Sequence, residues 1–463
     1  MIKFGTDGWR AIIGDDYTVA NLKRVSAATA YWLKKTHEKP VVVLGYDCRF
    51  SGELFAKVAA RVLAHEGCKV HLSDNFASTP MVSLAATELH ADAGVVITAS
   101  HNPPMYNGFK IKSSYGGPAL PAQIEEVENL IPEIYEGHID PFEDLVDSEQ
   151  IVMVDMETMY CNHARKNFDL DAIRNSGMKL AYDAMFGAGQ NVLKRLLPDT
   201  ICLHCEFNPS FQGTAPEPIM RNLEEISRLI RKQGDIACGL ATDGDADRIG
   251  LLDSQGNFVD SHHIILMLLN YLHNKKGMTG MVVNSFSCTT KIARFCELHG
   301  LDNKVTKVGF KYICEYMVDN DVLLGGEESG GIAVKGHIPE RDGIWIGLTI
   351  WEYMAKEGKK LEELISEIHG IVGPFAMERS DLHIDEHLKQ EIMQKCEQDA
   401  FNSFGRYKVE RIEKTDGYKF FFDEKRWLMI RPSGTEPVLR TYAEAPTHEE
   451  ACEILKETKE AIC

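Results

Sequence analysis

The sequence predicts an α/β protein with three related α/β domains and a smaller C-terminal α+β domain around a central cleft. The chain has 463 residues, which is too many for one hydrophobic core and suggests three or four domains. Short apolar runs rich in β-branched residues alternate with amphipathic stretches, which is typical of βαβ units with mixed, largely parallel sheets. This alternation occurs three times, and we therefore predict three related domains.

The first round of the pattern lies in the N-terminal part of the chain. We expect strands at 41–45, 70–72 and 94–97, and helices at 52–66 and 81–89. Because the strands alternate with helices, the sheet should be largely parallel and covered by helices.

The second and third rounds repeat this order. The second has predicted strands at 178–183, 202–206 and 236–241 and helices at 189–197 and 223–232. The third has strands at 280–284, 304–308 and 322–325 and helices at 289–298 and 312–318. After about residue 373 the pattern changes to polar alternating segments, a lone strand at 427–430 and a helix at 448–462. The predicted domains are 1–145, 146–253, 254–370 and 371–463.

Composition narrows the class of protein. The formal net charge is −19, from 50 basic and 69 acidic residues, which argues against nucleic-acid binding. No long apolar run and no signal-peptide pattern is present, so we expect a cytoplasmic protein that has no membrane partner. We also expect a monomer or a homodimer.

Twelve cysteines are scattered along the chain, and one pair, Cys202 and Cys205, forms a C-x-x-C motif. No second pair follows it. A zinc site or a redox pair is one interpretation of the motif. Reduced, mostly buried thiols are the interpretation that we favour.

A serine-containing loop follows the last strand of the first round. Ser100 lies where that strand should end, with His101 beside it, Lys110 nearby and two prolines that stiffen the turn. A serine in this setting is typical of a nucleophile or a phosphate carrier. An ordinary helix cap would use the same residues, and this loop alone does not decide between the two.

An acidic loop follows the matching strand of the second round. Asp243, Asp245 and Asp247 occupy alternate positions, which fall on one side of an extended loop. Three hard oxygen donors suit Mg²⁺. An EF-hand would need a bidentate glutamate where Ser254 stands, and a solvated acidic turn is disfavoured because three carboxylates repel one another without a cation.

Two further loops carry polar residues. Glu327 and Ser329 follow the last strand of the third round, where a carboxylate and a hydroxyl suit vicinal sugar hydroxyls, although a helix N-terminus would look the same. The C-terminal domain offers a phosphate cradle with an anion nest, for which a simple hairpin is the alternative. This cradle contains Arg431, Ser433, Gly434, Thr435 and Arg440. Ligands bind at the carboxyl ends of parallel strands, so the first three loops could meet in one cleft.

Single cations elsewhere in the chain add positive charge against the acidic background. They are Arg10, Arg49, Lys110, Arg248, Lys311 and Arg341. Any one of them alone would more often be a solvated surface charge.

Together these segments resemble the α-D-phosphohexomutase superfamily, the phosphoglucomutases and phosphomannomutases. The resemblance covers the whole chain, with the four loops in the family's order. It also includes the runs 4–10 (FGTDGWR), 45–49 (GYDCR) and 308–311 (VGFK).

The resemblance implies a role for each loop. Ser100 would carry the phosphoryl group, and Asp243, Asp245 and Asp247 would bind Mg²⁺ together with it. His101, Arg10 and Lys110 would act near the transferring oxygen as general base, acid or electrostatic helpers. The substrate, a phosphorylated hexose, would contact Arg248, Lys311, Glu327, Ser329, Arg341, Arg431, Ser433, Gly434, Thr435 and Arg440.

The resemblance also implies a reaction. We expect a Mg²⁺-dependent phosphoglucomutase that interconverts glucose 1-phosphate and glucose 6-phosphate through phosphoserine, with glucose 1,6-bisphosphate as intermediate and activator. The G-E-E-S-G form of the sugar loop is similar to that of glucose-directed members. Gly331 stands where relatives carry a histidine, and Arg341, a poor base, where some carry lysine. Alternatives are a phosphomannomutase, a dual-specificity enzyme, a Mg²⁺-dependent sugar phosphatase and a non-catalytic sugar-phosphate sensor.

Overall fold

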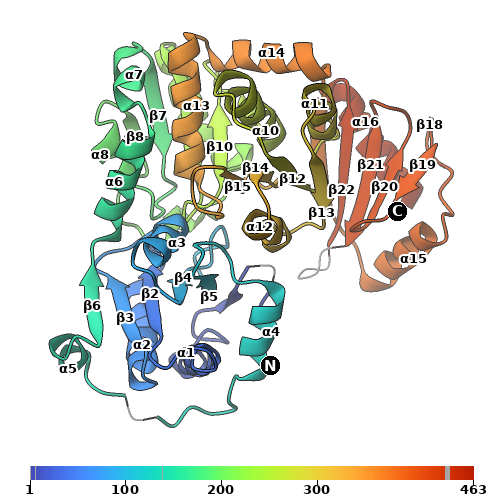
Figure 1. The fold of residues 1–463 in the computed structure, drawn as a ribbon. Helices are drawn as coiled ribbons and strands as arrows, with labels where there is room; N and C mark the ends of the chain where they lie inside the picture. Colours follow the sequence, from blue (N-terminus) through green and yellow to red (C-terminus); the bar gives the residue numbers. More distant parts are fainter. Residues whose placement is uncertain (1, 6, 138, 433–437, 463) are drawn as a thin grey trace. The chain divides into compact units, whose positions relative to one another are not determined.

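The structure is a computed structural model that describes residues 2–5, 7–137, 139–432 and 438–462 (Figure 1). The chain forms two compact units. The larger unit comprises Met1–Met281 and Gly309–Leu364, and the smaller unit comprises Val282–Val308 and Ile365–Cys463. Among the described residues, no helix is both long enough and apolar enough to cross a membrane.

The first sheet of the larger unit has six strands in the order β1-β5-β4-β2-β3-β6. These strands are β1 (Trp9–Ile12), β2 (Val41–Tyr46), β3 (Lys69–Ser73), β4 (Ala93–Ile97), β5 (Tyr106–Ser113) and β6 (Ile151–Val154). β2 pairs in parallel with β3 and β4, as the sequence predicts, and β3 pairs in parallel with β6, a strand that the sequence did not predict. β5 runs antiparallel to both β4 and β1, and the sequence did not predict it.

Helices cover both faces of this sheet. α1 (Val19–Leu33), α2 (Gly52–His65) and α4 (Pro121–Asn129) pack on the face that presents Val42 and Leu44. On the other face, Val82 of α3 (Thr79–Glu88) lies over Gly45, where an added Cβ would come within 2.5 Å of Val82 Cγ2. α5 (Phe142–Asp147) precedes β6. The two-sided cover explains why the parallel strands appear as continuous apolar runs.

The second sheet has the order β11-β10-β9-β7-β8. Its strands are β7 (Lys179–Asp183), β8 (Ile201–Leu203), β9 (Ile236–Thr242), β10 (Ile249–Leu252) and β11 (Phe258–Val259). Here too a parallel core, β8-β7-β9, is extended by antiparallel strands. The neighbouring helices are α6 (Met156–Asn167), α7 (Leu170–Asn175), α8 (Val192–Leu196), α9 (Glu224–Gln233), α10 (Ser261–Leu269) and α13 (Gly343–Glu357).

The third round contributes elements to both units. The larger unit holds α12 (Phe310–Asp319) and the antiparallel pair β14 (Val322–Gly326) and β15 (Ile332–Val334). The smaller unit holds α11 (Lys291–His299) and the parallel pair β12 (Met281–Ser285) and β13 (Asn303–Thr306). α14 (Leu361–Val372) runs across the boundary between the units in the sequence.

One connection recurs in all three rounds. The loops between β4 and β5, between β9 and β10 and between β14 and β15 each join a strand to an antiparallel neighbour. These loops contain Ser100, the three aspartates and Glu327, respectively. Each loop also has a residue with positive φ: Ser100 at 52°, Ala246 at 56° and Gly330 at 85°. The fold thus repeats one tight reversal at these three predicted functional loops.

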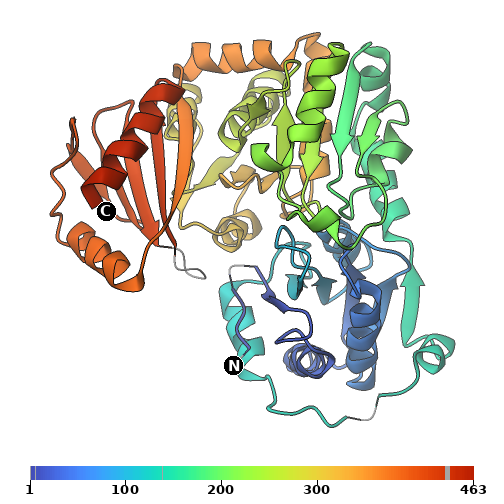
Figure 2. The same cartoon turned by 180° about the vertical axis from the view of Figure 1, so that it is seen from behind.

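The remainder of the smaller unit is a five-stranded antiparallel sheet in the order β16-β22-β21-β20-β19. Its strands are β16 (Ala376–His383), β19 (Arg411–Glu413), β20 (Tyr418–Phe421), β21 (Trp427–Pro432) and β22 (Val438–Ala445). α16 (His448–Ile462) lies across one face (Figure 2), and α15 (Glu386–Glu397) and the hairpin β17 (Ser403–Phe404) and β18 (Tyr407–Lys408) complete the unit. The prediction of a lone strand at 427–430 was wrong, because this strand pairs on both sides with strands whose polar alternation hid them.

Candidate active site

Ser100 lies three residues beyond β4 with only 1% of its surface exposed. Its hydroxyl donates a hydrogen bond to Asp243 Oδ2 at 2.7 Å, and its backbone N–H donates to Thr98 Oγ1 at 2.8 Å. The structure therefore brings the serine loop and the acidic loop together, although 143 residues separate them in sequence. The left-handed backbone at Ser100 is rare for a residue with a Cβ and occurs more often at functional turns.

A buried arginine holds the serine loop in place. The guanidinium of Arg49 donates to four backbone carbonyl oxygens of the loop and its exit, at 2.6 to 3.0 Å. These oxygens belong to Ser100, Asn102, Pro103 and Tyr106. Arg49 Nε also pairs with Asp47 Oδ2 at 3.2 Å. Arg49 thus clamps the loop instead of adding a free positive charge to the site.

Asp243, Asp245 and Asp247 are all fully buried, and their ligand atoms lie within 4.8 Å of one another. Asp245 Oδ1 and Asp247 Oδ1 have no hydrogen-bond partner among the described residues. Burial, together with repulsion from the other two carboxylates, raises the pKa of Asp243 well above its ordinary value. Three converging hard oxygen donors with unpaired atoms fit Mg²⁺, which would also relieve this repulsion.

Two buried cations balance part of the charge of the acidic cluster. Lys110 Nζ, on β5, lies 2.8 Å from Asp245 Oδ2, 3.0 Å from Asp247 Oδ2 and 2.9 Å from Asp7 Oδ2. Although burial opposes it, these carboxylates raise the pKa of Lys110 above its ordinary value, so Lys110 stays charged. Arg341 pairs with Asp247 Oδ2 at 2.7 Å and also with Asp7. Lys110 is therefore suited to electrostatic stabilisation and not to the role of a general base.

His101 and Arg10 flank the serine. His101 Nδ1 lies 3.4 Å from Ser100 Oγ. Burial, with repulsion from Arg248, Arg10 and other cations, holds the pKa of His101 well below its ordinary value, so its imidazole is neutral. Arg10 Nη1 donates to Asn102 Oδ1 at 2.7 Å, on the same loop. A neutral imidazole can accept a proton, which makes His101 the better candidate for a base.

The sugar loop presents a buried carboxylate. Glu327 is 5% exposed, and its Oε1 accepts a hydrogen bond from the backbone N–H of Gly309 at 2.8 Å. Burial and the nearby Glu328 raise the pKa of Glu327 to about 7, although Arg341 and Arg248 oppose this shift. Ser329, at the tip of the same loop, is half-buried.

The side chain of Arg341 explains why position 331 carries a glycine. An added Cβ at Gly331 would lie 2.4 Å from Arg341 Cδ. The Arg341 side chain also lies over the ring of Phe310, with its guanidinium carbon 5.3 Å from the ring centroid. Arg341 thus occupies the space that a side chain at position 331 would need. This geometry supports a binding or charge-balancing part for Arg341.

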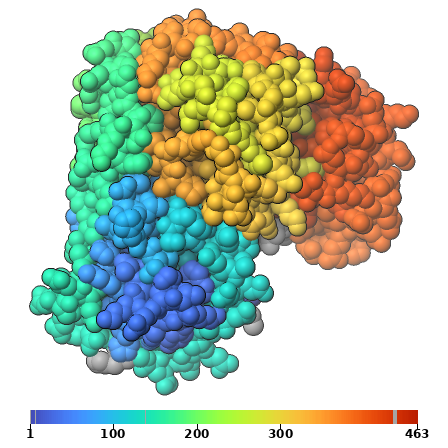
Figure 3. All heavy atoms as spheres, viewed as in Figure 1, coloured from blue at the N-terminus to red at the C-terminus, as the bar shows by residue number. Residues whose placement is uncertain are grey.

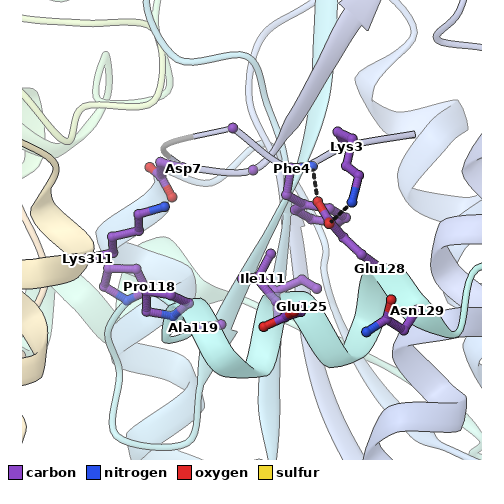
Figure 4. A pocket seen from close by; sticks show the side chains of 14 residues that line it. Lys3, Phe4, Asp7, Ile111, Pro118, Ala119, Glu125, Glu128, Asn129 and Lys311 are labelled. Carbon is purple, nitrogen blue, oxygen red and sulfur yellow. Dashed lines mark hydrogen bonds and ion pairs between the residues drawn. The ribbon is translucent and has the colours of Figure 1, made fainter. Parts of the chain in front are cut away.

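A cavity of about 300 Å³ opens beside this cluster within the larger unit (Figure 4). Lys311 and Asp7 point toward one another at one end, and Lys3 and Glu128 pair at the other. Ser100 does not line this cavity, which places Lys311 at the margin of the cluster and not beside the serine.

Residues that the sequence did not single out complete the site. Asp7 bridges Lys110 and Arg341, and these cations, with Lys112, hold the pKa of Asp7 well below its usual range against the effect of burial. Lys112 Nζ, on β5, pairs with Glu340 Oε2 at 2.7 Å. Figure 3 shows that the blue to cyan surface of the first α/β region adjoins the gold to orange surface of the segment that follows residue 309. Thr79, at the start of α3, donates to Asp245. The only sequence signal for these residues was the motif at 4–10, which contains Asp7.

Two predicted phosphate ligands lie in the smaller unit. Arg431 on β21 and Arg440 on β22 are directly opposite one another in the strand register. Arg431 Nε donates to Asp416 Oδ2 at 3.1 Å. Like charges placed across from one another disfavour the sheet unless an anion or a carboxylate balances them. Ser433, Gly434 and Thr435 lie outside the described residues.

Family models match most of the chain. The four domain families described as Phosphoglucomutase/phosphomannomutase match in order. The alpha/beta/alpha domains I, II and III match residues 1–138, 158–256 and 260–370, and the C-terminal domain matches residues 388–461.

Whole-chain relatives carry related names. A phosphoglucomutase/phosphomannomutase of Thermococcus kodakarensis is 29% identical over 98% of this chain and 96% of its own length. A phosphoglucosamine mutase of Carboxydothermus hydrogenoformans is 31% identical over 95% of this chain and 94% of its own. A solved structure from Thermus thermophilus, named provisionally as a phosphomannomutase, superimposes with a TM-score of 0.88 at 31% identity and covers 100% of this chain and 99% of that one.

These matches agree with the buried serine and aspartate loops and with the three-fold repeat of the α/β pattern. The superfamily that they define is Mg²⁺-dependent, and the buried aspartate cluster is a group that could bind such an ion. The chain belongs to the phosphoglucomutase/phosphomannomutase family of the α-D-phosphohexomutase superfamily and is an intramolecular phosphotransferase of the isomerase class.

Proposed function

We propose that this phosphohexomutase is a phosphoglucomutase that interconverts glucose 1-phosphate and glucose 6-phosphate. The observation that carries the phosphoryl-transfer part of the proposal is the contact between Ser100 and the aspartate loop, with Oγ 2.7 Å from Asp243. The choice of glucose rests on the G-E-E-S-G form of the sugar loop at 326–330. A hydroxyl that is hydrogen-bonded to a cluster of three carboxylates suits a phosphoryl carrier beside a metal centre. A non-catalytic sensor would not need this arrangement.

In this proposal, phosphorylated Ser100 donates its phosphoryl group to the free hydroxyl of the sugar phosphate. Glucose 1,6-bisphosphate forms, turns around and returns its other phosphoryl group to Ser100. His101 accepts the proton of the attacking hydroxyl. Lys110 and Arg10 stabilise the charge that develops on the transferring group. Mg²⁺ held by Asp243, Asp245 and Asp247 would neutralise phosphoryl charge when it is bound.

The sugar would be recognised by Glu327 and Ser329. An ionised Glu327 accepts hydrogen bonds from two neighbouring hydroxyls, and Ser329 can donate or accept one. Arg248, whose buried Nε has no hydrogen-bond partner among the described residues, would bind a phosphate oxygen together with Lys311 and Arg341.

The phosphate that is not being transferred needs a separate site. We assign it to Arg431, Arg440 and the segment with Ser433, Gly434 and Thr435. In this scheme the domains 1–145, 146–253, 254–370 and 371–463 each supply one loop: the serine, metal, sugar and phosphate loop, respectively.

The substrate is tested by a side-by-side rate assay. Purified enzyme with Mg²⁺ and trace bisphosphate is given glucose, mannose or glucosamine 1-phosphate, and kcat/KM is measured for each. We expect the highest value for glucose 1-phosphate. A higher value for glucosamine 1-phosphate, the substrate class in the name of the Carboxydothermus relative, would overturn the glucose assignment. A higher value for mannose 1-phosphate would overturn it as well, and release of inorganic phosphate in place of isomer would indicate a phosphatase.

A further inference from the structure

The C-x-x-C pair lies at an open edge of the second sheet. Cys202 is on β8, which is the strand at one end of that sheet (Figure 1). The backbone turns at His204, whose φ is 46°. Both cysteines are partly exposed, and the Cys202 thiol donates a hydrogen bond to the carbonyl oxygen of Thr200 at 3.5 Å. Eight other described cysteines are buried, and Cys452, which is exposed, lies in the smaller unit. The pair is therefore the accessible dithiol of the described chain.

His204, one of the two residues between the cysteines, makes a metal site less suitable than a redox pair. Both ring nitrogens of His204 are already engaged, with Nδ1 2.9 Å from Asp183 Oδ1 and Nε2 3.3 Å from Glu225 Oε2. These carboxylates raise the pKa of His204, which favours the imidazolium form, and an imidazolium cannot bind a metal. Among the described residues no third ligand converges with the two cysteines, so the pair falls short of a structural zinc set.

The surroundings differentiate the two thiols. Lys194 Nζ lies 2.5 Å from the carbonyl oxygen of Cys205. The hydrogen bond from Cys205 and the charge of Lys194 lower the pKa of Cys202 against the effect of burial, while the pKa of Cys205 is raised. Cys202 is thus the better nucleophile, and Cys205 is placed to attack it in turn.

Main-chain hydrogen bonds connect this pair to the metal loop. The carbonyl oxygen of His204 accepts from Phe186 N–H at 2.9 Å, and two residues further on Ala188 N–H donates to the carbonyl oxygen of Gly244 at 2.9 Å. Gly187 packs so closely that an added Cβ would lie 2.6 Å from the carbonyl oxygen of Asp243. The segment 184–188 therefore touches the C-x-x-C bend at one end and the aspartate loop at the other.

We propose that Cys202 and Cys205 form a reversible disulfide by exchange with a low-molecular-weight disulfide, and that this change weakens metal binding at the aspartate loop. Cys202 thiolate attacks one sulfur of the small disulfide, breaks its S–S bond and releases one small thiolate. Cys205 then loses its proton, attacks the Cys202 sulfur and displaces the second small thiolate. The protein dithiol is oxidised, and the small disulfide is reduced to two thiols. The new bond draws the bend at His204 inward and shifts the segment 184–188 against Gly244.

The full-length protein is equilibrated in buffers of increasing oxidised-to-reduced glutathione ratio, alkylated and mapped by mass spectrometry. We expect the peptide with Cys202 and Cys205 to become an internal disulfide before any other cysteine reacts. Mn²⁺, a spectroscopic probe for the Mg²⁺ site, should bind the oxidised form at least about threefold more weakly, because a shift in ligand positions costs affinity. Dithiothreitol should restore the affinity, and a Cys202→Ser/Cys205→Ser variant should not respond to glutathione disulfide.

The matched control is Cys452→Ser, which should keep the full redox response. The proposal is overturned if Cys202 and Cys205 stay reduced while other cysteines react, if they form only mixed disulfides, or if Mn²⁺ affinity is unchanged after the disulfide forms. The expected parallel fall in mutase rate rests on the proposed function. Disulfide formation and Mn²⁺ binding do not, so a failure to isomerise glucose 1-phosphate would leave both measurements informative.

Discussion

The serine loop and the metal loop share one topology and are stabilised in different ways. Both join a parallel strand to an antiparallel neighbour, and both contain a residue with positive φ. The serine loop is stabilised by a residue outside it, because the guanidinium of Arg49 donates hydrogen bonds to the loop's carbonyl oxygens. The metal loop uses its own carboxylates, since Asp243 Oδ1 accepts from the backbone N–H of Arg248 at 3.0 Å and Asp245 accepts from Thr79.

This difference follows from what each loop must do. A phosphoryl carrier needs a fixed backbone because its single hydroxyl must be aligned with an acceptor. A metal centre gains its order from the ion and from the cations that balance its carboxylates. Substitutions should therefore distinguish the two kinds of stabilisation. Loss of Ser100 or of the metal should change the chemistry, and loss of the Arg49 guanidinium should change the position of the serine loop.

The largest effect should come from Ser100→Ala. Removal of the hydroxyl removes the covalent route, and we expect turnover to fall by about a thousandfold or more. The assay follows glucose 6-phosphate with bisphosphate supplied. Ser114→Ala, an exposed serine beyond β5, is the control and should keep full activity. If Ser100→Ala keeps more than about a tenth of the rate, a different group carries the phosphoryl group.

Loss of the metal should be the next largest effect. After exhaustive chelation we expect turnover to fall at least about a hundredfold, because the ion supplies several kcal/mol of charge stabilisation. Added Mg²⁺ should restore it. Asp245→Asn should weaken Mn²⁺ binding while leaving the serine loop intact, as its Oδ1 is one of the unpaired carboxylate atoms. Full activity after chelation would contradict a metal role for the aspartate cluster.

Arg49→Lys tests the clamp on the serine loop. A lysine cannot reproduce the fork that reaches four carbonyl oxygens, so we expect kcat to fall by about a hundredfold while KM changes little. Arg24→Lys, which removes a guanidinium bonded to the carbonyl oxygen of Pro132, is the matched control and should keep kcat. If Arg49→Lys raises KM instead, Arg49 acts on substrate binding and not on the loop.

The smallest effect concerns the pH dependence of the sugar loop. Because the pKa of Glu327 is raised to about 7, its carboxylate ionises as pH rises through that value, and kcat/KM should rise with it. Glu327→Gln should lower kcat/KM about tenfold above this pH. Its pH profile should then show only the change that comes from ionisation of the substrate phosphate. Glu328→Gln removes a charge that raises the pKa of Glu327, so in this variant the rise of kcat/KM with pH should occur at lower pH. An unchanged profile in both variants would place the sugar site elsewhere.

The sequence predicted the parallel strands and the polar loops at their ends because buried strands appear as apolar runs. It missed β5, whose Lys110 and Lys112 look like surface residues and are buried only because Asp7 and Glu340 meet them from distant parts of the chain. Such pairing cannot be recognised from local composition. For the same reason Arg49 appeared as an isolated charge, since its acceptors are backbone carbonyl oxygens that lie about 50 residues further along the chain.

The claim that Ser100 carries the phosphoryl group is tested most directly by following that group. Enzyme treated with glucose 1,6-bisphosphate is digested and mapped by tandem mass spectrometry, and a second sample is mixed with glucose 1-phosphate in a rapid-quench experiment. We predict one phosphoryl group on Ser100 and its transfer to the sugar at a rate no slower than kcat. A phosphoryl group on another residue, none at all, or a transfer slower than kcat would contradict the account.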